Sequence, residues 1–439
     1  MTDPPPASLD QLLSVVNEHH GRTGTAVAIV GQHTNPGGEA VELTSYGRLR
    51  VPSLDVDLVA VGLTADEALG CAALIAQSTS DADVPIPQQI DADGWHAYAD
   101  EAGALRTEHT QPRAAPSDPV ANATTSVLPR DNDDYLRAAA TTAADLATLA
   151  PQVPAGLRQA VEGADPTLDV DINAWFAEDC DLPRLTLLGP VGARTHGTAI
   201  AKRKPYYTEL LTYLATRPHG ATPEEVANAF SITGPRVRND IKVLRDWLGV
   251  NPRTGRKHLP DARDSAAARA RGIGVYQVED LLIDADLFRR LRVRGESRGA
   301  DGIDDLRQAL QLVTGQPFDK LRPGGWTWLY DGDRLDHHLT CGIVDVAHLI
   351  TTRAVAKGDL NTARAATQIA ASAAPYEEIP RLDLAAIATA AGHRQEAARI
   401  IRDEVCNRSD DGSPPLELSE RTEQILAAHD WLPPMKSAS

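Results

Sequence analysis

The sequence predicts a multidomain, mainly α-helical fold that begins with a small α/β domain. Two observations carry this prediction. A chain of 439 residues is long enough for several domains, and apolar residues recur at helical spacing through most of its second half. The composition, 42% hydrophobic and 24% charged, is that of an ordinary globular protein, which excludes the fibrous and fully disordered classes.

Charge is distributed unevenly along the chain, which carries −18 as a whole. Residues 1–183 contain 8 Arg, no Lys and 28 acidic residues, a balance of −20. Residues 184–259 contain 13 basic and 5 acidic residues, or +8, and residues 260–439 contain 22 basic and 28 acidic residues, or −6. A basic segment between two acidic ones is typical of a module that binds a polyanion. A solvated, arginine-rich surface is the alternative interpretation.

The N-terminal α/β domain is expected to span residues 1–99. A β-type run over 25–30 precedes a hairpin pattern over 41–51 and a capped helix over 64–76. The first residues lack the basic and apolar regions of a secretory signal, and no apolar run approaches the roughly 18 residues of a membrane helix. We therefore expect a cytoplasmic protein without membrane contact.

Residues 100–132 are rich in Ala, Pro, Thr and Ser and contain few large apolar side chains. This composition predicts a disordered linker, because little apolar surface is available to offset the entropy of ordering. Residues 133–183 are expected to form a helical connector. Its first helix covers 134–149, and a second one ends near residue 162, after the break at Pro151 and Pro154.

The segment 184–280 has the order of a winged helix-turn-helix domain. A β-type run over 184–188 opens it, and a second run over 272–278 closes it. Prolines, glycines and capping residues divide the chain between them into three helices, over 206–216, 222–230 and 235–248. A strand, three helices and a returning strand make a winged helix, in which a polar insertion at 261–271 lengthens the wing.

The third of these helices has two distinct faces. Val237, Ile241, Leu244 and Leu248 form an apolar stripe, while basic residues occupy another face. Such a helix buries one side and offers the other to the major groove of DNA. We expect base contacts from five residues: Arg236, Arg238, Asn239, Lys242 and Arg245. We expect phosphate contacts from six flanking residues: Lys202, Arg203, Lys204, Arg253, Arg256 and Lys257.

An alternative for this helix is an ordinary amphipathic surface helix. Its cations would then pair with Asp240 and Asp246 rather than with DNA. The position of the helix within a winged-helix order favours the DNA interpretation.

From residue 284 onward the pattern is helical with short breaks. Helices are expected over 286–294, 303–313, 334–356, 360–373, 377–391, 395–407 and 420–430. Regular helix pairs of this length predict a tetratricopeptide-like domain over 281–411, followed by a C-terminal helix and tail over 412–439. Trp326 and Trp328 lie in a loop between these helices, and we interpret them as a core anchor rather than as an exposed partner site.

Several motifs resemble a known family of regulators. The central segment, with RLTLLGPV (184–191), VLRDWLG (243–249) and VYQV (275–278), resembles the OmpR-type winged helix of actinobacterial antibiotic regulatory proteins. The sequences DLFRRL (286–291) and ALQLVTGQPF (309–318) resemble their bacterial transcriptional activator domain. GWTWL (325–329), DVAHL (345–349) and APYEEIPR (374–381) are similar to a subgroup that carries this module after membrane helices and a LysM domain.

The resemblance covers residues 184–411 and, more weakly, 41–76. It implies DNA binding through the third helix and the wing, and dimerisation or effector contact through the helical domain. The insertion at 261–271 departs from the family pattern, as does the lack of membrane and LysM segments. No Walker motif is present, so the ATPase module of larger relatives is not expected.

Enzymatic chemistry is not expected. The sequence contains no Gly-x-Ser-x-Gly, His-Glu-x-x-His or other catalytic spacing, and we predict neither a cofactor nor a metal. The best metal candidates, His337, His338, Asp345 and His348, are interpreted as solvated or hydrogen-bonded helix residues. The four cysteines, Cys71, Cys180, Cys341 and Cys406, lie far apart and are expected to be buried, reduced thiols.

The sequence therefore predicts a cytoplasmic, sequence-specific transcriptional regulator, an activator by its resemblance, with double-stranded DNA as its partner. RNA polymerase contact and homodimerisation are both open for the helical domain. The alternative is a tetratricopeptide-like interaction scaffold whose winged helix does not bind DNA. Autoinhibition connects these two hypotheses: the acidic residues 1–183 would fold back on the basic module, so that their removal raises DNA affinity. A third hypothesis, in which the helical groove senses a small ligand, has no specific residue to support it.

Overall fold

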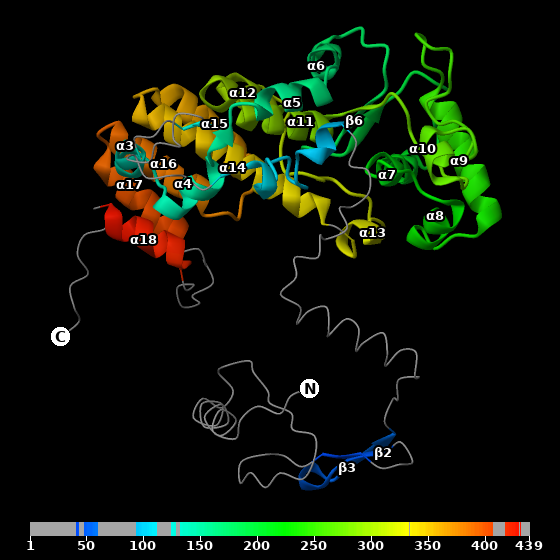
Figure 1. The fold of residues 1–439 in the computed structure, drawn as a ribbon, viewed down its shortest axis with the longest axis horizontal. Coiled ribbons are helices and arrows are strands. Elements are labelled where there is room, and N and C mark those ends of the chain that lie inside the picture. Colours follow the sequence, from blue (N-terminus) through cyan, green and yellow to red (C-terminus); the bar gives the residue numbers. More distant parts are fainter. Residues whose placement is uncertain are drawn as a thin grey trace. The chain divides into compact units, whose positions relative to one another are not determined.

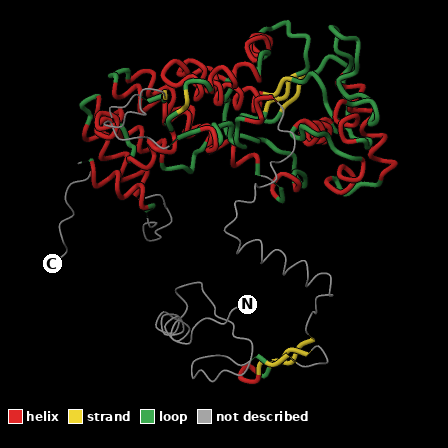
Figure 2. Tube along the Cα trace, viewed as in Figure 1, coloured by secondary structure: helices red, strands yellow, loops and turns green. Residues whose placement is uncertain are grey.

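The structure of the chain is a computed structural model, and it describes residues 41–43, 48–59, 94–111, 124–128, 132–332, 334–406, 418–429 and 431. Contacts divide the chain into two units, Met1–Gln88 and Gln89–Ser439. Helices dominate the described residues, and the strands are short and few (Figure 1 and Figure 2). The prediction of a mainly α-helical, multidomain fold is confirmed at this level.

The described part of the first unit is a three-stranded antiparallel sheet. Its strands are β1 (Glu42–Leu43), β2 (Arg48–Val51) and β3 (Val56–Val59), in the order β1-β2-β3, with η1 (Pro52–Leu54) between β2 and β3. Leu49 of β2 pairs with Leu43 on one side and with Leu58 on the other. The expected hairpin over 41–51 is confirmed. The strand expected over 25–30 and the helix expected over 64–76 lie outside the described residues.

The second unit begins with short elements that precede the basic segment. They are η2 (Gly94–Ala97), η3 (Thr107–His109), β4 (Thr124–Thr125), α3 (Asn132–Ala138), α4 (Ala143–Leu149), β5 (Val153–Pro154), α5 (Leu157–Ala164) and α6 (Leu168–Phe176). The single helix expected over 134–149 is divided in two, because Thr142 adopts an extended backbone and caps α4 in a capping box with Asp145. The sequence interpretation missed α6.

The disordered linker expected over 100–132 differs from the structure where residues are described. Leu105, Val127 and Leu128 are buried, and the backbone N–H of Leu105 donates to Glu296 Oε2 at 2.7 Å. The segment has few large apolar residues, but those that the structure describes are in the core. Composition alone counts such residues and does not show where they pack.

The basic segment forms a small sheet and a three-helix unit. β6 (Arg184–Thr186) is central, antiparallel to β7 (Gly192–Arg194) and parallel to β8 (Leu282–Ile283). The three expected helices are confirmed as α7 (Lys204–Ala215), α8 (Pro223–Ala229) and α9 (Gly234–Leu248), and α10 (Ala266–Arg271) lies in the predicted insertion. The strand expected over 272–278 is reduced to one bridge, Tyr276 to Ala221, because Gly272, with φ +68°, ends α10 and the chain must turn back.

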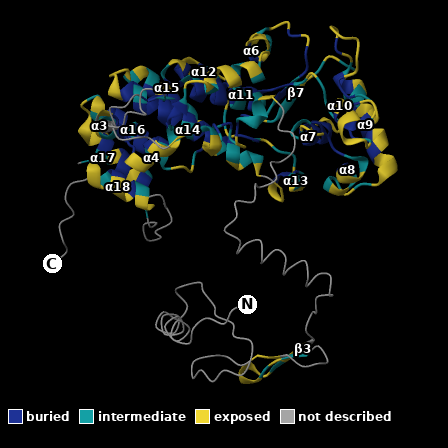
Figure 3. Ribbon diagram, viewed as in Figure 1, coloured by how far each residue is buried: buried dark blue, intermediate teal, exposed yellow. Residues whose placement is uncertain are grey.

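The helices of the C-terminal half follow in close agreement with the sequence pattern. They are α11 (Asp284–Arg298), η5 (Gly299–Gly302), α12 (Ile303–Gln311), α13 (Thr327–Tyr330), α14 (Leu335–Ala356), α15 (Leu360–Ala373), α16 (Ile379–Ala390), α17 (Arg394–Ile400), the π-helical segment η6 (Ile401–Cys406) and α18 (Glu420–Ala428). Figure 3 shows buried residues along α14, α15 and α16. The short elements η5 and α13 were not expected.

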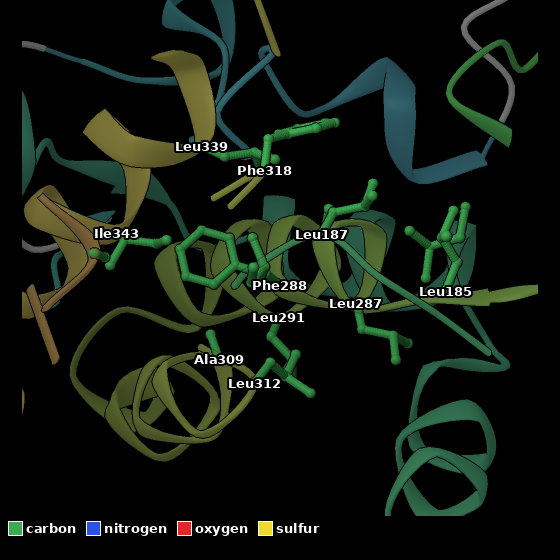
Figure 4. Close-up of a cluster of buried hydrophobic side chains, with 14 of the residues drawn as sticks. Leu185, Leu187, Leu287, Phe288, Leu291, Ala309, Leu312, Phe318, Leu339 and Ile343 are labelled. Carbon is green, nitrogen blue, oxygen red and sulfur yellow. The ribbon is translucent and has the colours of Figure 1, made fainter. Parts of the chain in front are cut away.

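The boundary expected at residues 280–281 falls within a shared core. Phe288 of α11 is fully buried and lies between Leu187, which follows β6, and Ile343 of α14 (Figure 4). The Asp284 carboxylate at the start of α11 accepts hydrogen bonds from the backbone N–H groups of Leu187, at 2.7 Å, and Leu188, at 3.0 Å. The basic segment and the helical half are thus packed together without an exposed linker.

A loop from the helical half, residues 322–328, also packs against the basic segment. The backbone N–H of Trp326 donates to Glu209 of α7 at 2.7 Å, and Arg322 binds the same buried carboxylate. The rings of Trp328 and Tyr213 meet edge to face at 5.2 Å. The interpretation of the two tryptophans as a core anchor is confirmed, since Trp326 is buried and Trp328 packs on the same cluster.

Helix α14 is long, with 22 residues, and largely apolar. Among the described residues it is the one helix that meets the length and composition criteria for crossing a membrane, and most of it is buried within the unit. Charged and polar residues interrupt its sequence, which is why no apolar run of that length is apparent there. Inside the unit, His348 Nδ1 lies 2.8 Å from the buried carboxylate of Asp383 in α16, so this histidine is hydrogen-bonded, as interpreted.

The cysteine prediction needs one correction. Cys180 is buried and Cys406 is partly buried, but Cys341 is exposed on α14, four residues after His337. An apolar local sequence suggested burial for Cys341, yet its position on the helix turns it outward. Cys71 lies outside the described residues.

Candidate nucleic-acid interface

Helix α9 is built with one buried and one exposed side. Pro235 occupies its first turn, Gly249 ends it with φ +82°, and Thr233 precedes it in an extended conformation. The apolar stripe of Val237, Ile241, Leu244 and Leu248 is buried. The burial of this stripe fixes the rotation of the helix and leaves the other side in solvent, as the exposed residues along α9 show in Figure 3.

Three of the predicted base-contacting residues share the exposed side. Arg238, Asn239 and Lys242 are all exposed and lie within two turns of one another. Among the residues that the structure describes, no carboxylate forms an ion pair with Arg238 or Lys242. The alternative in which the helix cations pair with Asp240 and Asp246 therefore does not apply to these two side chains.

Arg245 departs from its predicted role as a base contact. Only 14% of its side chain is exposed. Its Nε donates to the carbonyl of Leu259 at 2.7 Å and its Nη2 to the carbonyl of Pro260 at 3.1 Å, and Asp261 pairs with it at 2.9 Å. On a helical wheel this residue lies at the edge of the exposed side, next to the wing. Its guanidinium joins residues 259–261 to α9 instead of facing solvent.

The remaining predicted base contact, Arg236, lies at the opposite edge of the exposed side. Its Nε is 3.5 Å from Asp240 Oδ2, while Arg203 Nη1 is 3.9 Å from Asp240 Oδ1. The structure thus brings together one residue predicted to read bases and one predicted to hold phosphate. Both guanidinium groups are about half exposed, and the carboxylate between them is buried.

The segment before α7 runs along α9. Backbone N–H groups of Gly197 and Thr198 donate to the carbonyls of Trp247 and Asp246, at 3.1 and 2.7 Å. A Cβ at position 197 would lie 2.2 Å from the Asp246 carbonyl oxygen, so only glycine permits this approach. The segment leads to Lys202, Arg203 and Lys204, all exposed. The predicted phosphate contacts before α7 are therefore close to α9 itself.

The other predicted phosphate contacts lie in a tight hairpin directly after α9. Val250 and Lys257 form an antiparallel bridge, and the Asn251 N–H donates to the Arg256 carbonyl at 2.8 Å. Arg253, Arg256 and Lys257 are exposed on this hairpin. The two basic clusters thus flank α9, one on the side of Arg236 and one at its C-terminal end.

The insertion adds basic residues that the sequence interpretation missed. Ser265 caps α10 by accepting the N–H of Ala268 at 3.1 Å, and Ala267 and Ala268 pack on Val275. Arg263, Arg269 and Arg271 are exposed there. A capping serine followed by three alanines is a helix signal that was available in the sequence. The insertion over 261–271 therefore contains an ordered helix and exposed arginines.

Tyr276 follows α10 and pairs with a residue shortly before α8. Its backbone N–H donates to the Ala221 carbonyl at 2.7 Å. Burial raises the pKa of its phenol, and the guanidinium groups of Arg245 and Arg238 partly offset this effect. Basic residues therefore lie beside Arg236, where Arg203 shares Asp240, and in the hairpin that follows α9.

Comparisons of the chain with models of protein families, with curated proteins and with solved structures give no match. The resemblance to the activator-domain regulators therefore rests on the motifs in the sequence, and membership of that family stays a prediction.

Proposed function

We propose that this protein is a sequence-specific DNA-binding transcriptional regulator that uses α9 as its recognition helix. The observation that carries the proposal is the exposed side of α9, where Arg238, Asn239 and Lys242 lie free of carboxylate partners within the described chain and have basic residues on both flanks. Within the described residues the buried arginines, Arg292 and Arg294, are paired with carboxylates, so an exposed cation without such a partner fits an external anion.

The side chains match the chemistry of base edges. Arg binds the O6 and N7 of guanine, Asn binds the N6 and N7 of adenine, and Lys donates to guanine or to phosphate. Recognition helices place their N-terminal part against the bases. Arg238, Asn239 and Lys242 lie in the first nine residues of the 15-residue helix, whereas the exposed Asp246 lies in its last turn, farther from the groove.

The finer architecture is part of the same proposal. Helices α7, α8 and α9 with the segment 249–279 would form a winged helix, and α14 to α17 a tetratricopeptide-like domain that activates transcription through polymerase contact or a second copy of the chain. The shared core at Asp284 and the Glu209 contact with the tryptophan loop support a rigid coupling of the two parts. A cytoplasmic location belongs to this proposal.

Selection of genomic DNA fragments by the full chain, at several salt concentrations, tests the proposal. Phosphate neutralisation predicts a steep fall in affinity with salt, and base contacts predict an enriched short motif. Arg364→Ala is a matched control, because Arg364 is an exposed arginine on α15, away from α9. A steep salt dependence without an enriched motif would reduce the proposal to non-specific binding, and no binding at low salt would favour the interaction scaffold.

A further inference from the structure

Helix α9 carries one buried acid within its basic surroundings. Asp240 is 5% exposed, and it lies on a helix whose other side presents arginine and lysine to solvent. A buried carboxylate is costly unless several donors compensate it. Its partners therefore indicate what the acid does.

The closest partners of Asp240 are two tyrosine hydroxyls from the first turn of α7. Tyr206 donates to Oδ2 at 2.8 Å and Tyr207 donates to Oδ1 at 3.1 Å. Burial raises the pKa of both phenols, and the adjacent Asp240 raises it further. The hydroxyls therefore keep their protons at physiological pH and remain donors. These bonds fix the carboxylate and join α7 to α9.

Two guanidinium groups flank the same carboxylate, but neither forms a close hydrogen bond with it. The separations of 3.9 Å for Arg203 and 3.5 Å for Arg236 exceed the 2.7–2.9 Å of a charge-assisted hydrogen bond. Arg203 also stacks over the Tyr206 ring, with its Cζ 4.2 Å from the centroid. The side chains are 46% and 51% exposed, so both remain accessible to a ligand from solvent.

Arg203 has a left-handed backbone at the start of α7. Its φ of +61° is in the region that favours glycine, and Arg334 has the same conformation, with φ +47°, directly before α14. The left-handed turn is thus one way in which this chain begins a helix, and Arg203 in this turn lies 3.9 Å from Asp240.

We propose that Asp240 is a positioning residue that holds Arg203 and Arg236 as a preformed site for one phosphate group. This inference rests on the proposed DNA-binding function and names the backbone phosphate as the ligand. Asp240 offsets the repulsion between two like charges, and the three groups together carry +1, which matches one phosphodiester. Arg236 then sets the position of α9 on the DNA backbone, and base reading is left to Arg238, Asn239 and Lys242.

The direction in which one substitution changes DNA affinity distinguishes a positioning role of Asp240 from a purely electrostatic one. Asp240→Asn removes a negative charge, so a purely electrostatic role predicts tighter DNA binding. Positioning predicts about five- to tenfold weaker binding, because the guanidinium groups lose their common anchor. Tyr206→Phe leaves the charge unchanged and should also weaken binding, by a smaller factor. Urea unfolding of each variant checks that the fold is kept, and tighter binding by Asp240→Asn would overturn the proposal.

A double-mutant cycle tests whether the arginines share one phosphate. Arg203→Gly removes the guanidinium and suits the positive φ, and Arg236→Gln removes the second charge. Each should weaken binding of a 20-base-pair duplex about tenfold, and the double variant should be little weaker than either single one, because one phosphate is lost in all three. If the double variant instead loses affinity by the product of the two single factors, the arginines bind separate phosphates, which would contradict the proposed site.

A small anion distinguishes failure of this site from failure of the proposed function. Inorganic pyrophosphate is titrated into the full chain while the Nε–H signals of Arg203 and Arg236 are followed by nuclear magnetic resonance. Joint shifts of both signals without any DNA binding would keep the site and overturn the proposed function. DNA binding without joint shifts, together with an additive cycle, would keep the function and overturn the site. Absence of both would overturn both.

Discussion

Two arginine-rich helices of equal length, α9 and α11, differ in how completely their cations are paired: in α9, Arg236 and Arg245 have carboxylate partners and two other cations do not. Each helix has 15 residues. In α11 all five arginines form ion pairs with carboxylates: Arg289, Arg290, Arg292, Arg294 and Arg298. In α9, Arg238 and Lys242 have no such partner among the described residues. Residue type is the same in the two helices, so the placement of acids decides whether an arginine is held in an ion pair within the fold or stays in solvent without one.

Half of the acids that pair with the arginines of α11, four of eight, come from the connector. Asp165 and Asp171 bind Arg290 at 2.7 and 2.8 Å, and Asp169 binds Arg294 at 2.7 Å. Part of the strongly negative N-terminal region is thus engaged in the core and not with α9. The hypothesis that residues 1–183 act as a removable inhibitor changes accordingly, because these residues include structural partners of α11.

Among the changes that test this comparison, removal of residues 1–183 is expected to lower the stability of the fold the most. It deprives Arg290 of both carboxylates and removes Leu146, Leu168 and Ile172 from the shared core. Losses of several kcal/mol from each of these sources exceed the usual total stability of a domain, about 5–15 kcal/mol. Circular dichroism during urea titration should show no cooperative unfolding. A chain that starts at residue 89 keeps these contacts and is the control, and cooperative unfolding of residues 184–439 would break the comparison.

A single substitution in each helix is expected to have the next largest effect. Arg290→Met should lower the free energy of unfolding by about 3–5 kcal/mol, because it leaves the buried Asp165 without its cation. Arg238→Met is the matched variant on α9 and should change stability by less than about 0.5 kcal/mol. Urea denaturation followed by tryptophan fluorescence measures both. Equal effects would show that the two helices do not differ in the way described.

The difference between these helices marks what the sequence can and cannot predict. The boundaries and faces of α9 depend on local spacing, caps and punctuation, and its predicted stripe of Val237, Ile241, Leu244 and Leu248 is buried as expected. The partners of Arg290 lie 119 and 125 residues away. Nothing in the sequence near α11 indicates these partners, so the burial of Arg290 was not predicted.

The candidate site shows the same limit on a smaller scale. Arg238, Asn239 and Lys242 are exposed, as their helical spacing indicated. Arg245 is at the edge of that face, and its partners at 259–261 depend on the path of the wing. The buried contact of Asp240 with Tyr206 likewise depends on how α7 crosses α9. Periodicity gives the face of a helix, whereas tertiary packing decides what lies at its edges.

Asp284, the first residue of α11, should make the free energy of unfolding depend on pH. Burial raises the pKa of its carboxyl to about 7, against three backbone N–H bonds that favour ionisation. Its pKa when folded is above the unfolded value of about 3.9, so its stabilising contribution is present at low pH and is lost as the pH rises through 7. Between pH 5 and pH 8 the wild type should lose about 2–3 kcal/mol relative to Asp284→Asn. Urea unfolding at the two pH values measures this difference, and a constant difference would contradict it.

On α9, Arg238→Ala is expected to act on binding rather than on stability. A bidentate guanine contact contributes about 1–3 kcal/mol, so affinity for a selected site should fall by that amount while affinity for random DNA changes little. Fluorescence anisotropy with both duplexes measures the ratio, and Arg364→Ala on α15 serves as the control. An equal loss on both duplexes would assign Arg238 to the phosphate backbone.

The smallest expected effect is that of Lys202→Ala, at the border of the exposed side of α9. Lys202 is exposed and precedes α7, so it should contact phosphate and weaken binding to selected and random duplexes alike, by about 1 kcal/mol or less. The slope of log affinity against log salt should become shallower by about one. Because Arg238→Ala changes the specificity ratio and Lys202→Ala changes the salt slope, the pair separates base reading from phosphate binding on one basic surface. A change in the specificity ratio for Lys202→Ala would place that residue within the reading face.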